Sequence, residues 1–477
     1  MVLHSELKFL VEYTVALNQS LEASGHKKLS RIQLGWLKFV LGGMLLTCSL
    51  CWSRLSRLSL CGYTDKALSK MFHHGLRCWE ALLACSTNAV LKYYDVREGA
   101  LVIDDTDRGR SKRTSKIYGV HKTLLKGTGG FHFAQNIVLV LLVTPRVTIP
   151  VGFRFYRPDP ALKEWEKQDD ELKAQGVPKR ERPRAPARDE NYPSREAIAS
   201  RLIEDFADNH PSVKVSGVIA DAGYCSPTFV ITTRETYPDA QVLTQIRSNQ
   251  KVKHGRGKET TVSKFFESRP WKTETICLRG HLPTVVNYCS AMLTVSSHGK
   301  KYLVVALRYD GADEPRFIIA ADSSWRPKDI LMYYSRRWLV EVFFEDWKQH
   351  EGWANLAYQQ AYEGSRRGLI LSLLLDHSLL FHELQSARLK HKLPALTVGS
   401  LRSAISSEAL YSLVESIVQS ENPTDQLHRL KQHLELSQIK TNSTKHIAGK
   451  NVPKLHPRSS SSPGPEASTL NDLKIAA

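Results

Sequence analysis

The 477-residue sequence has few cysteines for its length and no sign of a disulfide framework. Most of its eight cysteines lie in apolar segments, which is typical of buried thiols in a reducing compartment. Cys48 and Cys51 have the spacing of half a zinc site, but no second pair of Cys or His follows at a fitting distance. The cysteines therefore argue against zinc and favour the cytoplasm.

The sequence also lacks the hydrophobic segments that export or membrane insertion requires. No signal peptide is expected, because Glu6 and Lys8 interrupt the N-terminal segment where its apolar core would lie. The most apolar segment, residues 34–52, contains Lys38 and is short for a membrane span. We expect a buried helix there and no membrane partner.

Acidic residues are outnumbered by basic ones. The 66 Lys and Arg against 48 Asp and Glu give a formal net charge of +18, which predicts a polyanionic partner. Nucleic acid is the commonest such partner, and its binding would depend strongly on salt. A content of 42% hydrophobic and 24% charged residues predicts a globular chain, long enough for two to four domains.

Hydrophobic periodicity divides the chain into segments of different secondary structure. The predicted order is a helical domain, the first part of an α/β core, a β-rich insertion, the completion of the core, C-terminal helices and a disordered tail, at residues 1–95, 99–249, 250–325, 326–385, 386–440 and 441–477. Residues 157–194 are charged and rich in proline, and they are expected to leave the core as an excursion. The helical domain carries scattered Arg and Lys, which suits DNA binding and ordinary helix packing equally well.

Two predicted strands of the core end in aspartate. The first reads VIDDTD and contains Asp104, Asp105 and Asp107; the second reads VIADAGY and contains Asp221. A carboxylate at the end of a buried strand is held rigidly at the edge of the sheet, where a hard divalent cation can reach it. The alternative is an aspartate that caps the next turn, and either aspartate taken alone is better explained that way.

A third acid lies on a predicted helix at residues 327–350. On a helical wheel four polar side chains share an arc of roughly 60°; they are Tyr334, Arg337, Glu341 and Lys348. The opposite side is apolar and is expected to pack on the sheet; it contains Leu339, Val340, Phe343 and Trp347. An acid flanked by two cations and a phenol suits a phosphodiester substrate, and the alternative is a solvated amphipathic helix.

The spacing of Tyr334, Arg337, Glu341 and Lys348 resembles the Tyr-Arg-Glu-Lys signature of a large group of insertion-sequence DDE transposases, sometimes called the "IS four" group. The segments that contain Asp105-Thr and Asp221-Ala-Gly-Tyr are similar to the first and second acidic motifs of this group, in the same order. The resemblance covers residues 99–385. It implies an RNase H-like mixed-sheet core, which a β-rich insertion interrupts between the second Asp and the Glu.

The resemblance also implies a function and roles for individual residues. A cut-and-paste transposase would bind terminal inverted repeats of double-stranded DNA as a homodimer, cleave them and transfer the strand to target DNA. Asp105, Asp221 and Glu341 would bind two Mg²⁺ or Mn²⁺ ions, and residues 1–95 would recognise the element's ends. Phosphate contacts would come from Tyr334, Arg337 and Lys348.

Several alternatives remain open from the sequence alone. Trp271 in the insertion could hold a flipped DNA base or be an ordinary core aromatic. Asp104 adjoins Asp105 but points to the other face of the strand, and Glu345 lies on the same side of its helix as Glu341. The chain could also be a DNA-binding relative that does not cut, or a different RNase H-like nuclease.

Overall fold

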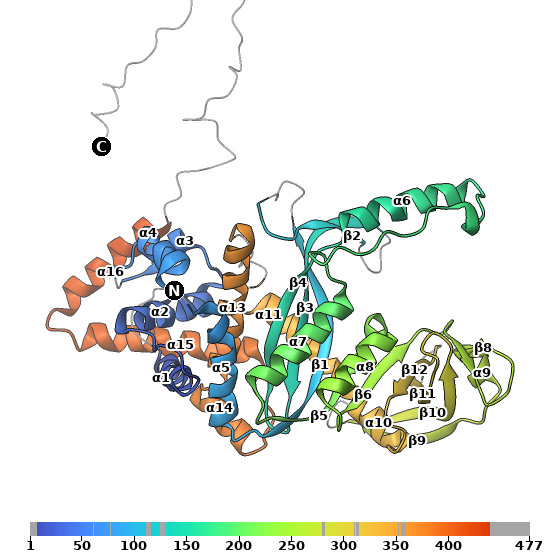
Figure 1. Cartoon of the computed structure of the whole chain (residues 1–477). Helices are drawn as coiled ribbons and strands as arrows, with labels where there is room; N and C mark the ends of the chain where they lie inside the picture. Colours follow the sequence, from blue (N-terminus) through green and yellow to red (C-terminus); the bar gives the residue numbers. More distant parts are fainter. Residues whose placement is uncertain are drawn as a thin grey trace, which may run out of the picture.

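The computed structural model describes residues 7–60, 62–76, 78–110, 116–124, 130–278, 282–309, 311, 314–351, 353 and 359–438. The segment at 441–477, predicted to be disordered, lies outside these residues. The chain forms a helical region at one end, a large twisted sheet beside it, and a long helical arm that projects from the sheet (Figure 1).

The N-terminal region is helical, as its hydrophobic spacing predicts. Its elements are α1 (Lys8–Ala23), α2 (Arg31–Thr47), α3 (Trp52–Leu58), α4 (Asp65–Lys70), a π-helical turn (Met71–Gly75) and α5 (Trp79–Tyr93). A capping box starts α2, because Ser30 and Gln33 each accept a hydrogen bond from the other's backbone N–H. The apolar segment predicted to be buried lies largely in α2, and no described helix is long and apolar enough to cross a membrane.

The strands follow α5. They are β1 (Glu98–Arg110), β2 (His121–Leu124), β3 (Phe131–Val143), β4 (Thr148–Tyr156), β5 (Lys214–Ala220), β6 (Gln241–Ile246), β7 (Lys251–Lys253), β8 (Thr260–Thr261), β9 (Lys272–Leu278), β10 (Leu282–Val295), β11 (Lys300–Tyr309) and β12 (Arg316–Ala320). Strands β3 and β4 pair in the antiparallel direction as a hairpin, and both are rich in β-branched residues.

The remaining helices lie between and after the strands. They are α6 (Pro160–Ala174), α7 (Arg195–Asn209), α8 (Pro227–Thr236), α9 (Val262–Glu267), α10 (Pro327–Tyr334), α11 (Trp338–Gln349), α13 (Ala361–Leu379), α14 (Glu383–Lys390), α15 (Val398–Val418) and α16 (Pro423–Gln438). The side chain of Ser194 accepts a hydrogen bond from the Ala197 N–H and so caps α7. The charged segment at 157–194 contains α6, which forms the projecting arm (Figure 1).

The sheet mixes parallel and antiparallel strands. Its first part has the order β4-β3-β1-β5-β6, in which β3 is antiparallel to β4 and β1, and β1, β5 and β6 run parallel. Strand β12 then pairs with β6 in the antiparallel direction, and β11 and β10 follow. The β-rich segment predicted at 250–325 is therefore hydrogen-bonded into the same sheet.

The two faces of β1 contact different helices. Leu101 and Ile103 belong to the apolar core that includes residues of α7 and α8, whereas Ala100 and Val102 belong to the core that includes residues of α10 and α11. Because side chains alternate along a strand, residue 104 points to the α11 face and Asp105 to the α7 face.

The helix predicted at 327–350 is divided in two. Residues Ser335–Arg337 form a 3-10 turn between α10 and α11. A 3-10 turn advances by about 120° per residue, so a wheel drawn at about 100° misplaces the residues before the turn. The predicted apolar side of α11 is confirmed, because Val340, Phe343 and Trp347 are buried.

The N-terminal and C-terminal helices pack together in one helical region. The rings of Tyr13 and Phe381 lie 5.4 Å apart, and the Arg402 side chain donates a hydrogen bond to the Leu45 carbonyl over 2.8 Å. Local sequence patterns do not predict such contacts, because each amphipathic helix can be covered by many partners.

A buried chain of hydrogen bonds joins this helical region to the sheet. His377 on α13 lies 2.9 Å from the Pro150 carbonyl through Nε2 and 2.7 Å from the Ser86 hydroxyl through Nδ1. A carbonyl can only accept, so Nε2 carries the proton and Nδ1 accepts from Ser86, which in turn lies 2.7 Å from the Tyr13 hydroxyl. Burial lowers the pKa of His377 to about 4, and the neutral ring is the form that fits this chain of bonds.

His377 is therefore expected to make stability fall in mild acid. An unfolded histidine has a pKa of about 6.5, so below that pH the unfolded chain binds the proton first. The contribution of neutral His377 to the free energy of unfolding is fully present above pH 6.5 and is lost as the pH falls towards 4. The expected decrease is roughly 2 kcal/mol between pH 7 and pH 5. Urea unfolding of wild type and of His377→Gln at pH 7 and pH 5 measures this loss of stability. An equal pH dependence in the two proteins would contradict the role of His377.

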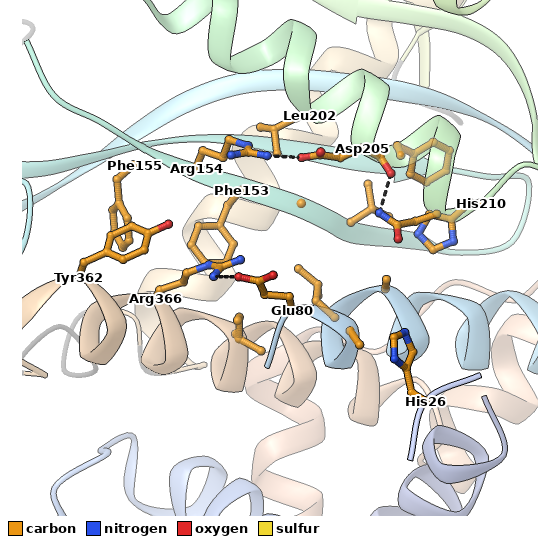
Figure 2. A pocket seen from close by; sticks show the side chains of 18 residues that line it. His26, Glu80, Phe153, Arg154, Phe155, Leu202, Asp205, His210, Tyr362 and Arg366 are labelled. Atoms are coloured by element: carbon orange, nitrogen blue, oxygen red, sulfur yellow. Dashed lines mark hydrogen bonds and ion pairs between the residues drawn. The ribbon is translucent and has the colours of Figure 1, made fainter. Parts of the chain in front are cut away.

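A cavity of about 400 Å³ lies between the helical region and the sheet (Figure 2). Its charged side chains are already paired, since Arg154 contacts Asp205 over 2.7 Å and Arg366 contacts Glu80. The Arg366 contact lowers the pKa of Glu80. The first ion pair joins β4 to α7, and the second joins α13 to α5. Among the described residues that line the cavity, each arginine therefore already has a carboxylate partner and is not available to bind a phosphate.

Candidate catalytic site

The second predicted acid lies at the carboxyl end of β5. Asp221 follows Ala220 directly, and its Oδ1 accepts a hydrogen bond from the Gly223 N–H over 2.7 Å. Its backbone also starts the short 3-10 turn that contains Tyr224. The parallel strands β1 and β5 pair as far as Ile103 and Ala220, so Asp104 and Asp221 follow the same point of the sheet.

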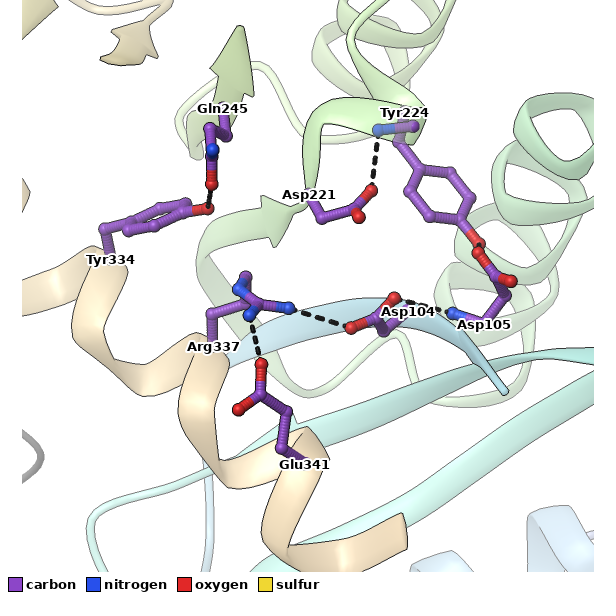
Figure 3. Close-up of polar contacts among 9 residues, drawn as sticks. Asp104, Asp105, Asp221, Tyr224, Gln245, Tyr334, Arg337 and Glu341 are labelled. Atoms are coloured by element: carbon purple, nitrogen blue, oxygen red, sulfur yellow. Dashed lines mark hydrogen bonds and ion pairs between the residues drawn. The ribbon is translucent and has the colours of Figure 1, made fainter. Parts of the chain in front are cut away.

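Asp104 and Glu341 meet at Arg337. The guanidinium donates to Asp104 Oδ2 over 2.8 Å through Nη1 and to Glu341 Oε1 through Nη2 (Figure 3). The Asp104 and Arg337 side chains are only 14% and 17% exposed, whereas Glu341 is 50% exposed. These ion pairs thus join β1 to α11, and solvent reaches them on the side of Glu341.

The electrostatics of this group are dominated by burial and by neighbouring carboxylates. Burial, reinforced by the charge of Asp221, raises the pKa of Asp104 to about 7, although Arg337 opposes the change. Burial also disfavours the charged form of Arg337, but nearby Tyr334 and Asp104 outweigh it and raise the pKa of that guanidinium. A site of this kind favours a cation next to Asp104 and Asp221.

Asp105 points to the opposite face of β1, where it has a separate set of partners. The Tyr224 hydroxyl donates to its Oδ1 over 3.4 Å, and Arg195 Nε lies 3.4 Å from its Oδ2. Burial raises the pKa of Tyr224 well above its usual value, and the charge of Asp105 adds to the effect. The predicted trio of Asp105, Asp221 and Glu341 is therefore not gathered at one point, and Asp104 is the aspartate beside Arg337.

The predicted phosphate-contacting residues differ in exposure. Tyr334 is 5% exposed and its hydroxyl donates to Gln245 Oε1 over 3.3 Å, so its ring is part of the core. Lys348 is partly buried, with Nζ 5.4 Å from the centre of the Trp353 ring, and burial lowers its pKa. Of these three predicted phosphate-contacting residues, Arg337 is the one that contacts the carboxylates of Asp104 and Glu341.

Trp271 immediately precedes β9, in the segment predicted as the β-rich insertion. Its indole Nε1 donates to the Phe266 carbonyl over 3.2 Å, and the Arg308 guanidinium lies 5.2 Å from its ring centre. The ring also packs against the apolar core. Its predicted role in holding a flipped base stays a prediction.

Comparison with protein families gives two matches. A family described as "DDE superfamily endonuclease" matches residues 33–274, and one described as "Transposase DDE domain" matches residues 193–373. The first match covers more than half of the chain. The protein belongs to the DDE endonuclease superfamily. No curated protein matches this DDE endonuclease.

The donor chemistry of this DDE endonuclease fits divalent cations. Asp104 and Asp221 supply carboxylate oxygens, which hard cations prefer. The pKa of Asp104 is raised first by burial and then by the charge of Asp221, and a bound cation would offset both effects. Within the described residues, no three Asp, Glu, His or Cys side chains lie close enough together to hold a metal ion. Glu341 is turned towards Arg337 instead.

Sequence reasoning did not find the two polar partners of Asp105 in this DDE endonuclease. Arg195 follows the Ser194 cap of α7, and nothing in its local sequence distinguishes it from a solvated helix residue. Tyr224 belongs to the motif that begins at Asp221, but its contact with Asp105 depends on how β1 and β5 pair. Both residues come from elements that only the sheet brings together.

Proposed function

We propose that this DDE-superfamily protein is a cut-and-paste DNA transposase of the group with the Tyr-Arg-Glu-Lys signature. The contacts of Asp104 and Glu341 with one arginine, together with the position of Asp221 beside Asp104 at the ends of the paired strands β5 and β1, carry the proposal. The strand order β4-β3-β1-β5-β6 also supports an RNase H-like core, with β7 to β12 as the insertion.

Asp104, Asp221 and Glu341 are the proposed metal ligands, and Asp104 takes the place that the sequence motif suggested for Asp105. Strand alternation and the contact with Arg337 favour Asp104. Divalent cations bound there would supply Lewis-acid polarisation of the scissile phosphate and activation of the attacking water or 3′ hydroxyl.

The protein's own groups hold the substrate in this proposal. Arg337 presents a rigid fork of donors beside the carboxylates, which matches the geometry of a phosphate oxygen pair. Asp104 and Glu341 occupy that fork here, so a phosphate would compete with Glu341, the more exposed of the two. Lys348 lies on the same helix and adds positive charge along the DNA backbone.

The proposed partners follow from the same function. Residues 1–95 would recognise the terminal inverted repeats of an insertion sequence, and two copies of the chain would bring both ends together on the nucleoid. The formal charge of +18 supports a DNA partner and predicts affinity that falls steeply with salt.

A cleavage assay tests the proposed function directly. Purified protein is incubated with DNA that carries the inverted repeats flanking its gene, with Mg²⁺, with Mn²⁺ or with chelator. We expect metal-dependent cuts at the repeat ends and joined products with target DNA. Binding without cutting would instead indicate a silent relative, and cutting without joining would indicate another nuclease.

Glu341→Gln is expected to lower the cleavage rate by roughly a hundredfold and to leave DNA binding intact. The effect is moderate because the side chain is half exposed and water can replace one of its oxygens as a ligand. Glu345→Gln is the matched control, since Glu345 is exposed one turn further along α11 and accepts a hydrogen bond from Gln349. Equal losses in the two variants would contradict the assignment of Glu341.

A further inference from the structure

A second cavity, of about 530 Å³, lies at the base of the α6 arm. Its polar lining consists of Lys116, Tyr118, His121, Arg157, Lys163 and Tyr192. None of the described residues that line it is acidic. Its volume falls in the range of roughly 300–1,000 Å³ that small-molecule sites occupy, and its chemistry suits a ligand that is both anionic and aromatic. We call it the arm-base pocket.

The centre of the arm-base pocket is an arginine held between two aromatic rings. The Arg157 Cζ lies 4.9 Å from the centre of the Tyr118 ring and 4.6 Å from that of Tyr192. Its Nη2 donates to the Asn191 carbonyl over 3.5 Å. Stacking fixes the guanidinium without neutralising it, which is how arginine is presented to phosphates and bases.

The other cations of the pocket also bond to neutral groups. Lys163 Nζ donates to the Lys122 carbonyl over 3.2 Å, and His121 Nδ1 lies 2.8 Å from the Gly119 carbonyl. Burial lowers the pKa of His121, so the positive charge comes from Lys116, Arg157 and Lys163. A carbonyl partner positions a lysine but leaves its charge for an anion.

A line of contacts runs from the pocket to Asp105, the residue next to Asp104 on the other face of β1. Arg195 lies 3.4 Å from Asp105, its Cζ lies 4.4 Å from the centre of the Tyr156 ring, and that ring lies 6.0 Å from the His121 ring. His121 on β2 and Gly109 on β1 both pair with Ala134, which lies on β3 between them. Gly109 is five residues beyond Asp104 along β1. At about 3.3 Å per residue, the pocket lies some 17 Å from the site along the strand, within the reach of a few nucleotides.

We propose that the arm-base pocket binds one unstacked nucleotide of a DNA strand that extends from the candidate catalytic site. Arg157 and Lys163 contact its phosphate, and the ring of Tyr192 or Tyr118 stacks on its base. Paired bases in a duplex have no free face, so a cavity with aromatic walls selects single-stranded nucleotides. The inference rests on the proposed function only in that DNA is the substrate.

Fluorescence anisotropy with the full chain tests the pocket. The probes are a short oligothymidylate and a duplex of equal length, each titrated over a range of salt. We expect Arg157→Gln/Lys163→Gln to weaken single-strand binding roughly tenfold and to reduce its log–log salt slope by about 1.4, or about 0.7 for each lost contact. Tyr192→Ala should weaken single-strand binding by about tenfold through lost stacking.

The matched control is Lys167→Gln/Lys173→Gln, which removes two exposed charges from the same helix without touching the pocket. It should remain within about threefold of wild type, because neither lysine lines the pocket. Equal losses for control and pocket variants, or equal losses on single strand and duplex, would overturn the inference. Wild type that binds no DNA would overturn the proposed function too, whereas wild-type binding that the pocket changes leave intact would overturn the pocket alone.

Discussion

Asp221→Asn is expected to lower the rate of metal-dependent DNA cleavage by on the order of a thousandfold, while DNA affinity stays within about twofold of wild type. Asp221 ends a buried strand and its carboxylate faces Asp104, so in the proposed site it holds cations that both reacting oxygens need. Asparagine keeps the shape and the Gly223 hydrogen bond but loses the charge. Rates come from a gel-based cleavage assay and affinities from anisotropy.

Asp322→Asn is the control for the structural role of Asp221. Asp322 lies two residues after the end of β12, and its Oδ1 accepts a hydrogen bond from the N–H two residues on, at 2.9 Å against 2.7 Å for Asp221. If turn formation were the role of Asp221, the two variants would lose similar amounts of stability and activity. A rate for Asp221→Asn that matches that of Asp322→Asn would end its assignment as a metal ligand.

Asp104→Asn and Asp105→Asn are expected to differ by on the order of a hundredfold or more in cleavage rate, with Asp104→Asn the slower. Asp104 shares the α11 face of β1 with Arg337 and Glu341, whereas Asp105 contacts Arg195 and Tyr224 on the other face. The two variants make the same chemical change at adjacent positions, so each is the control for the other.

The opposite order of rates would return the first acid to Asp105, as the sequence motif suggests. It would also require β1 to twist so that Asp105 turns towards Asp221 in the DNA complex. Urea unfolding of both variants separates a fold defect from a catalytic one, because Asp104→Asn leaves Arg337 with Glu341 as its charged partner.

Much of the fold could be predicted because its signals are local. Helical spacing, β-branched segments and the Ser194 cap indicate α1 to α5, the β3–β4 hairpin and α7 from neighbouring residues alone. The burial of Val340 and Trp347 also follows from periodicity within one helix. The break at Ser335–Arg337 was missed, since no glycine or proline marks it and the 3-10 turn is a feature of how α10 and α11 pack.

The sequence by itself supplied candidate acids at the ends of two predicted strands and on a helix, their order along the chain, and the basic character that predicts a polyanionic partner. Only the tertiary structure decided that Asp104 lies beside Arg337 while Asp105 lies beside Arg195, and that Tyr334 is a core residue. The reason is physical: neighbouring side chains on a strand point to opposite faces, and which face meets α11 depends on long-range strand pairing and helix packing. The arm-base pocket, assembled from four separate segments, was decided in the same way.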